Sequence, residues 1–253
     1  MFKNSKFNGD ISNWNVSKVE NMEQMFSDSY FNNTISSWNV SNVTNMACMF
    51  QCAPFTGNIS SWNVGNVTNM EYMFQSTPFT GNISSWNVSN VTNMSGMFAC
   101  SEFNGDISNW DVSNVTDMNS MFQSSKFTGD ISKWDVSNVD TMSWMFYKSK
   151  FNKDISNWNI KKVIRKGDMF YKCPIKEEYK PKFNVSESFA FDVINNRKKP
   201  INLYNTQIGK ILKAIENREE LSDNDYEILT QYTGIYKQID KDELHSLIDY
   251  FTD

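Results

Sequence analysis

Apolar residues recur along most of this chain with a period of 24 residues. The chain aligns with itself without an insertion from Met1 to Asp168, which gives seven repeats, and an eighth begins at Met169. The fifth repeat reads MFACSEFNGDISNWDVSNVTDMNS, with apolar residues at fixed places among polar ones. A unit this short cannot bury its apolar side chains alone, whereas identical units stacked in register bury them against one another. The pattern therefore predicts a solenoid of stacked repeats.

Bulky residues occupy fixed columns of this repeat. All 14 methionines fall in two columns, and 15 of the 19 phenylalanines fall in two others. Seven of the eight tryptophans share one column, which comprises Trp14, Trp38, Trp62, Trp86, Trp110, Trp134 and Trp158. Equivalent residues of a solenoid lie above one another. We therefore expect stacked rings in a continuous core, with Trp110 as a core residue and not a ligand contact.

Alternating residues predict one short parallel strand in each repeat, represented by residues 107–113 of the fifth repeat. The side chains expected to point inward are Ile107, Trp110 and Val112. Ser113 or Asn114 can cap a short turn, after which the chain returns apolar residues to the core. Gly105 is expected to permit the tight bend that leads to the next strand. The predicted fold class is an α/β repeat solenoid with short parallel strands.

The repeat pattern ends near residue 173, and a different organisation follows. Residues 174–200 are expected to form a capping or linker segment. Apolar residues at helical spacing then predict three short amphipathic helices in residues 201–253. These helices would form a small all-α domain after a solenoid at residues 1–173.

The motif MF-x(4)-F-x-G-D-I-S-x-W-[DN]-V-S-N-V-T-x-M resembles the BspA-like surface-protein family of leucine-rich repeats. It recurs seven times and covers about two thirds of the chain. The resemblance implies a parallel strand per repeat on a concave face, a turn or short helix on the convex side, and a role in adhesion or surface recognition. Many relatives carry an export signal or a lipid anchor. Neither is visible in this sequence, and no apolar run is long enough to span a membrane, so a cell-surface, virion or intracellular location remains open.

Residues that alternate with the inward side chains are expected on the outer face of the strands. The row of candidate contact residues, which we call the strip, comprises Asn39, Asn63, Asn87, Asn109, Asp111, Ser113 and Asp135. One interpretation is an amide ladder that hydrogen-bonds along the stack. The other is a polar surface that binds a protein or glycan partner. The two interpretations are compatible.

Charge argues against nucleic acid or an anionic membrane as the main partner, because the formal net charge is -5 and both partners require a basic excess. Between Lys148 and Lys182, however, 11 of the 24 Lys and Arg residues occur with only four acids. This segment is either a solvated capping repeat or a contact for an acidic partner or polyanion. The basic candidates are Lys161, Lys162, Arg165 and Lys166.

Catalytic and metal-binding patterns are not found in the sequence. The single histidine, His245, lies near no nucleophile motif, and no phosphate-binding glycine loop occurs. The aspartates that suggest calcium are Asp106, Asp111, Asp130, Asp135 and Asp154, but they are spread over several repeats and form no compact loop. Four cysteines, Cys48, Cys52, Cys100 and Cys173, match no disulfide or metal spacing and are expected to be free thiols. We expect a non-enzymatic protein without cofactor or metal.

Two functions remain on these grounds. The first is a macromolecular binding or adhesion scaffold that uses the strip. The second is a structural component of a larger assembly, such as a virus particle or surface layer. The first repeat, Met1 to Gln24, keeps the apolar residues of an internal repeat, although terminal repeats usually have a polar outer face. We therefore expect further repeats or a partner, which can be a second copy, to cover that end.

Overall fold

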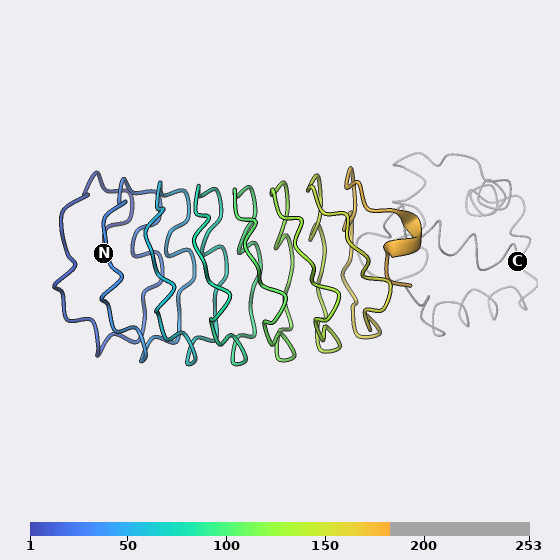
Figure 1. The fold of residues 1–253 in the computed structure, drawn as a ribbon, viewed down its shortest axis with the longest axis horizontal. Helices are drawn as coiled ribbons and strands as arrows, with labels where there is room; N and C mark the ends of the chain where they lie inside the picture. Colours follow the sequence, from blue (N-terminus) through green and yellow to red (C-terminus); the bar gives the residue numbers. More distant parts are fainter. Residues whose placement is uncertain (183–253) are drawn as a thin grey trace, which may run out of the picture. The chain divides into compact units, whose positions relative to one another are not determined.

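The chain divides into two units, Met1–Lys182 and Phe183–Asp253, and the computed structural model describes residues 1–182. The three expected helices at 201–253, and most of the expected linker at 174–200, lie outside the described residues. Figure 1 shows the first unit as a series of similar coils that lie side by side along one axis. Consecutive repeats are therefore neighbours in space.

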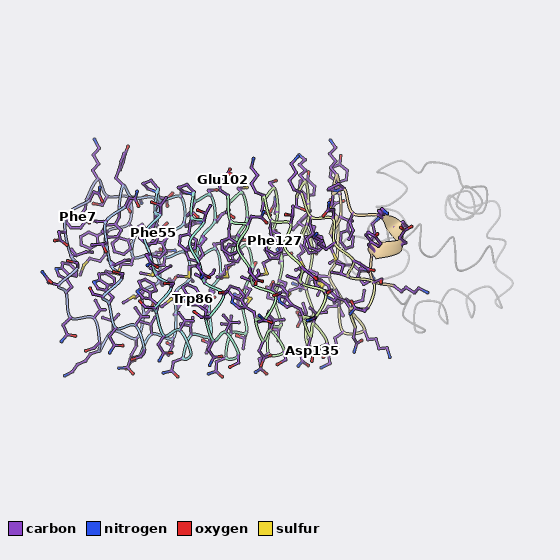
Figure 2. All side chains as sticks on the ribbon, in the orientation of Figure 1. Phe7, Phe55, Trp86, Glu102, Phe127 and Asp135 are labelled. Carbon is purple, nitrogen blue, oxygen red and sulfur yellow. The ribbon has the colours of Figure 1, made fainter. Side chains whose placement is uncertain are left out.

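The apolar columns form the interior of these coils. Trp110 is only 4% exposed, and Phe98 and Phe103 are fully buried. Equivalent residues of the other internal repeats are buried in the same way. In Figure 2 the labelled rings of Phe55 and Phe127 lie among the packed side chains between the walls of the coils. The prediction that Trp110 belongs to the core is confirmed.

Phenylalanine rings stack in two neighbouring columns. Phe98 stacks on Phe74 of the preceding repeat at 5.8 Å between ring centroids, and Phe103 stacks on Phe79 at 6.3 Å. Phe98 and Phe103 also stack on each other at 4.3 Å. Offset stacks of this kind add specific ring contacts to the burial of apolar surface. Each ring is thus held from above, from below and from the side.

The tryptophan column connects the repeats by a side-chain hydrogen bond. The indole N–H of Trp110 donates to the carbonyl oxygen of Ile83 in the preceding repeat at 3.2 Å. Trp38, Trp62, Trp86, Trp134 and Trp158 make the equivalent bond. A buried indole N–H requires such a partner. The same side chain therefore supplies both core volume and inter-repeat pairing.

Backbone pairing between repeats lies outside residues 107–113, so the expected position of the strand was wrong. Within this segment Trp110 N–H donates to Ile107 O and Ser108 N–H to the Asp106 carboxylate, so these groups are used inside the repeat. The described residues contain no named strand. Isolated parallel bridges instead join one residue of each repeat to the next, in the series Asn21, Asn45, Asn69, Asn93, Asp117, Thr141 and Arg165.

A segment following each bridge carries most of the backbone bonds between repeats, and we call it the ladder segment, represented by residues 116–124. The N–H groups of Met118, Ser120, Phe122 and Ser124 donate to the next repeat at 2.7 to 3.0 Å. The alternate N–H groups, as in Met121 and Gln123, bond to carbonyls three residues earlier. This alternation satisfies the backbone with tight turns and inter-repeat bonds together.

Left-handed backbone recurs at two columns of the ladder segment, the last residue of one repeat and the fourth of the next. All 14 described non-glycine residues with positive φ lie there, as does Gly96 with φ +59°. Gly105, by contrast, has no positive φ. A Cβ at Gly105 would lie 2.9 Å from the Phe103 ring. The expected role of Gly105 in a bend is corrected: this glycine admits the ring.

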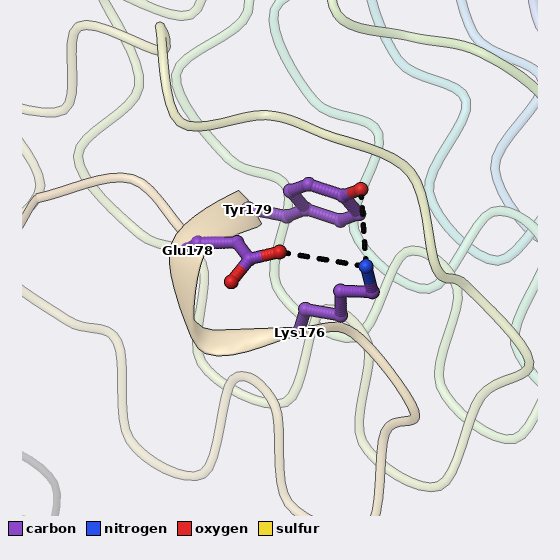
Figure 3. A network of polar contacts seen from close by, with 3 residues as sticks. All are labelled: Lys176, Glu178 and Tyr179. Carbon is purple, nitrogen blue, oxygen red and sulfur yellow. Dashed lines mark hydrogen bonds and ion pairs between the residues drawn. The ribbon is translucent and has the colours of Figure 1, made fainter.

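Residues 174–182 cover the last coil. They contain the only named element among the described residues, the 3-10 helix η1 (Glu177–Tyr179). Ile175 and Pro181 are buried, and Ile155 N–H donates to Tyr179 O at 2.9 Å. Figure 3 shows the Lys176 ammonium bonded to both Glu178 and the Tyr179 hydroxyl, each at 3.4 Å. These polar contacts face outward from the end of the stack.

Candidate interaction surface

The strip lies on the surface, as expected. Asn39, Asn63, Asn87, Asp111 and Asp135 are exposed at equivalent positions of successive coils; Asn109, two residues before Asp111, is also exposed, and Ser113 is half-buried. Figure 2 shows the labelled Asp135 near the outer edge of the coils. Each of Asn39, Asn63, Asn87, Asp111 and Asp135 accepts the backbone N–H two residues later, at 3.0 to 3.2 Å. Each of these exposed side chains holds a turn through one oxygen.

An amide ladder along the stack exists, but a different column forms it. The side-chain amide of Asn114 donates to Ser89 O of the preceding repeat at 2.8 Å. Asn42, Asn66, Asn90 and Asn138 make the same bond. The ladder interpretation of the strip was therefore wrong, because the strip oxygens bond within their own repeat. Every repeat from the second to the sixth has this asparagine, and that regularity was the signal in the sequence.

Aspartates at the preceding turn have the same local role. The Ser108 backbone N–H donates to the Asp106 carboxylate at 2.9 Å and holds the pKa of that carboxyl below its usual value. The pKa values of Asp130 and Asp154 are lowered in the same way. Within residues 1–182 no three His, Cys, Asp or Glu side chains are grouped to hold a metal ion.

The four basic candidates are divided between two places. Lys161 and Lys162 are exposed beside the strip column, and the Lys162 ammonium donates to Asn138 Oδ1 at 2.6 Å. Arg165 and Lys166 belong to the ladder segment of the last repeats, where Arg165 pairs with Thr141. Arg165 is exposed and Lys166 is half-buried.

A second candidate surface follows the ladder segments, and the sequence analysis missed it. We call it the ladder surface: the last two residues of one repeat and the third and fourth of the next, represented by Asn119, Ser120, Gln123 and Ser124. These columns differ from repeat to repeat, whereas the strip columns are nearly constant. This contrast was available in the sequence, but only the ladder bonds show that the four columns lie next to one another.

Electrostatic contacts confirm that the ladder columns are neighbours. Burial, and then the negative charge of Glu71 and Glu23, raises the pKa of Cys48 to about 11. Burial, and then repulsion by Asp117, raises the pKa of Glu71, whose carboxylate accepts the Asn93 amide at 3.3 Å. Burial also raises the pKa of Asp117. All four cysteines are free thiols in the structure.

The ladder surface changes character in the last three repeats. There it carries a group that we call the aromatic–basic patch: Trp144, Tyr147, Lys148, Tyr171 and Lys172. Trp144 is 42% exposed and Tyr171 is 44% exposed. The rings of Tyr147 and Tyr171 stack at 5.1 Å. The ammonium groups of Lys148 and Lys172 lie 5.0 and 5.2 Å from the ring centroids of Tyr147 and Tyr171.

Apolar side chains are also exposed in the first repeat. Trp14 is 42% exposed, against 4% for Trp38 in the next repeat, and Met1 is 84% exposed. Whether a partner covers Met1 to Gln24 stays a prediction.

Comparison with known proteins gives a family and no closer relative. Among the described residues no helix is long and apolar enough to cross a membrane. No curated protein and no solved structure matches the chain. The family described as "Mycoplasma protein of unknown function, DUF285" matches residues 1–82 and 76–183, which include every repeat described above. The chain therefore belongs to this family of repeat proteins.

Proposed function

We propose that this chain is a non-enzymatic binding scaffold, a solenoid of the leucine-rich-repeat kind similar to BspA-like surface proteins. The observation that carries the proposal is the strip, in which one exposed Asn or Asp recurs in successive coils and accepts a turn hydrogen bond that fixes it. The proposed partner is a protein or a glycan. Adhesion at a cell surface is the role that the resemblance favours.

Preorganisation supports a binding role for the strip. Binding normally costs entropy for each side chain that becomes immobilised. The Oδ1 atoms of Asn63 and Asn87 are already bonded to the backbone N–H of Gly65 and Ser89. Asn63 and Asn87 are exposed, and their side chains therefore need little further ordering. A partner with hydrogen-bond acceptors at the spacing of the repeats would meet a row of such side chains.

Low charge sets the kind of partner expected. Residues 25–96, which form repeats two to four, contain only two charged residues, Asp28 and Glu71. Recognition there would rest on many hydrogen bonds and not on electrostatic attraction, which mainly accelerates association. We propose that the partner of these repeats is polar and uncharged where it contacts the strip.

The proposal is tested by affinity capture with the intact chain, compared with the double variant Asn63→Asp and Asn87→Asp. Aspartate keeps the oxygen that accepts the turn N–H, as Asp111 and Asp135 do. It removes the amide donor and adds charge. A matched control is Asn32→Asp, because Asn32 is exposed in another column and its Oδ1 accepts Thr56 N–H.

We expect the unmodified chain and the Asn32→Asp control to capture the same protein or glycan, and the double variant to lose it. Equal capture by the unmodified chain, the double variant and the control would show that the strip does not bind the partner. Turnover of a substrate by the purified chain would contradict the non-enzymatic role.

A second candidate function is a structural component of a larger assembly. An assembly contact of this kind would cover exposed aromatic side chains such as Trp14, which is 42% exposed. In a native assembly, hydrogen exchange at residues 14–19 would be slow if that end is covered. Exchange as fast as in an unfolded peptide would contradict this role.

A further inference from the structure

We propose that the aromatic–basic patch is the docking site for a short acidic protein segment that carries an aromatic or apolar anchor. This inference rests on the binding function proposed above and assigns a place and a partner chemistry to it. It uses the ladder surface, whereas the proposed function uses the strip.

Comparison among the repeats shows that the stack does not require these residues. The column of Trp144 contains Gly96 and Ser120 in the two preceding repeats, and the column of Tyr147 contains Ala99 and Gln123. The backbone bonds are the same in all of them: Ser120 N–H donates to Ser143 O at 2.8 Å, and Trp144 N–H to Gly167 O at 2.8 Å. The backbone hydrogen bonds between repeats therefore do not require the large rings.

Trp144 occupies a backbone conformation that suits a small residue. Its φ is +57°, where glycine is unstrained and a bulky side chain is unusual. Gly96 has the same conformation with φ +59°. Tyr72 of the same column adopts it as well with φ +50°, so the stack accommodates a large ring there, and the exposed area of the ring is what distinguishes Trp144. Here the indole is also 42% exposed, so a large part of the ring is open to a partner.

The Trp and Tyr side chains of the patch are of the types enriched at the energetic centre of protein interfaces, and its lysines add positive charge around them. Lys148 and Lys172 lie against tyrosine rings, so their ammonium groups are partly positioned before a partner arrives. Arg165 is exposed on the same ladder segment. Asp168 is the one acidic residue of the ladder surface in these repeats, and Lys148, Lys172 and Arg165 outnumber it. A carboxylate-bearing segment fits this positive excess, and the exposed Trp144 and Tyr171 rings fit its anchor.

The neighbouring charges limit the partner to a short segment. On the ladder surface toward the N-terminus, Glu71 is a partly buried carboxyl, and no Lys or Arg occurs in that surface between Lys3 and Lys148. A long polyanion that followed the ladder would be repelled after the last repeats. Single-stranded nucleic acid also needs free ring faces for its bases, whereas Tyr147 and Tyr171 face each other. A short acidic peptide avoids both conflicts.

The test replaces each patch residue with the residue found in the same column of another repeat. The swap variant is Trp144→Ser, Tyr147→Gln, Lys148→Ser, Tyr171→Gln and Lys172→Ser. Ser120, Gln123 and Ser124 already occupy these columns in the adjacent repeat, so the swap preserves the repeat pattern. A cooperative thermal unfolding transition and an unchanged far-ultraviolet circular dichroism spectrum establish that the variant is folded, although the loss of the partly buried Trp144 ring lowers the midpoint.

The probe is an array of random dodecapeptides, followed by fluorescence anisotropy on the peptides that bind the unmodified full chain. We expect binders enriched in Asp and Glu with an aromatic residue. The swap variant should bind them at least tenfold more weakly, and added salt should weaken binding to the unmodified chain. A graft of Ser120→Trp, Gln123→Tyr and Ser124→Lys into the swap variant should restore part of the affinity.

Two peptide results would overturn the inference: binders without enrichment in Asp and Glu, or equal peptide affinity for the swap variant and the unmodified chain. Another kind of partner would also overturn it. This would be shown if the swap instead abolished binding of oligothymidylate, of phosphatidylserine vesicles or of a second copy of the chain. The two proposals can fail separately. If Asn63→Asp with Asn87→Asp removes the captured partner while the swap changes no peptide affinity, the binding scaffold stands and the patch does not. If the swap alone removes binding, the patch stands and the strip does not.

Discussion

Substitution of Trp110 by alanine tests the packing of the stack most directly. The side chain is 4% exposed, its indole N–H donates to Ile83 O at 3.2 Å, and its ring lies 6.3 Å from that of Phe98. Large-to-small substitution of a buried Trp costs about 3–5 kcal/mol. The loss of the N–H also leaves a buried carbonyl without its partner, which costs about 1–3 kcal/mol and places the expected loss near the upper end of that range.

Trp14→Ala is the matched control for this prediction. Trp14 occupies the same column but is 42% exposed, so it has a little over half of the burial of Trp110. We expect it to cost roughly half as much, about 2 kcal/mol. Urea unfolding of the two variants, followed by near-ultraviolet circular dichroism and by tryptophan fluorescence, would measure both losses. Equal losses, or an unchanged midpoint for Trp110→Ala, would refute this description of the core.

Three further predictions follow from the turns and the ladder surface. Asp117→Asn should stabilise the fold at neutral pH by about 0.5–1 kcal/mol, because burial raises the pKa of Asp117 and other repeats have Asn there. This gain in stability should disappear on acidification, when Asp117 becomes protonated. A lower stability of the variant at pH 7 would contradict the prediction. The carboxyls of Asp106, Asp130 and Asp154 have lowered pKa values because Ser N–H groups donate to them. Their contribution to the free energy of unfolding is therefore fully present above the pKa of the unfolded chain. It is lost as the pH falls through the lower pKa of the folded protein. Their triple Asn variant should therefore lose less stability between about pH 5 and about pH 2 than the unmodified chain, and parallel acid-unfolding curves would exclude this. Finally, we consider a variant in which Cys48 is the single remaining cysteine. Iodoacetamide at pH 8 should react with it more slowly than with free cysteine, because burial and nearby carboxylates raise the pKa of this thiol to about 11. Reaction at the rate of free cysteine would contradict the burial of Cys48 among these carboxylates.

The sequence predicted the columns of the core correctly. A period of 24 residues requires equivalent side chains to meet, so the burial of Phe98, Phe103 and Trp110 follows from spacing alone. The sequence also indicated which residues lie outside, because strict polar positions such as Asp111 and Asp135 alternate with the buried ones. These conclusions depend on which residues are apolar and on nothing more distant than the next repeat.

Backbone pairing could not be predicted from the same pattern. Trp110 and Val112 have the alternation of a strand, but Asp106 and Asp111 accept nearby N–H groups and replace strand pairing with turns. An Asp or Asn followed by a Ser N–H two residues later forms such a turn only where the local dihedral angles allow it. Side-chain alternation reports burial and does not show which partner each N–H group takes.

By itself the sequence determined the number of repeats, their register and the identity of the core side chains, because these follow from periodicity and hydrophobic burial. Only the tertiary structure decided where the repeats exchange hydrogen bonds, that Gly105 admits a phenylalanine ring, and that Trp144, Tyr147 and Tyr171 share one surface. The physical reason is that these features depend on left-handed backbone at two columns of each ladder segment. Residues as different as Ser120, Trp144 and Gly96 adopt that conformation there, so the stack imposes it and no local residue preference reveals it.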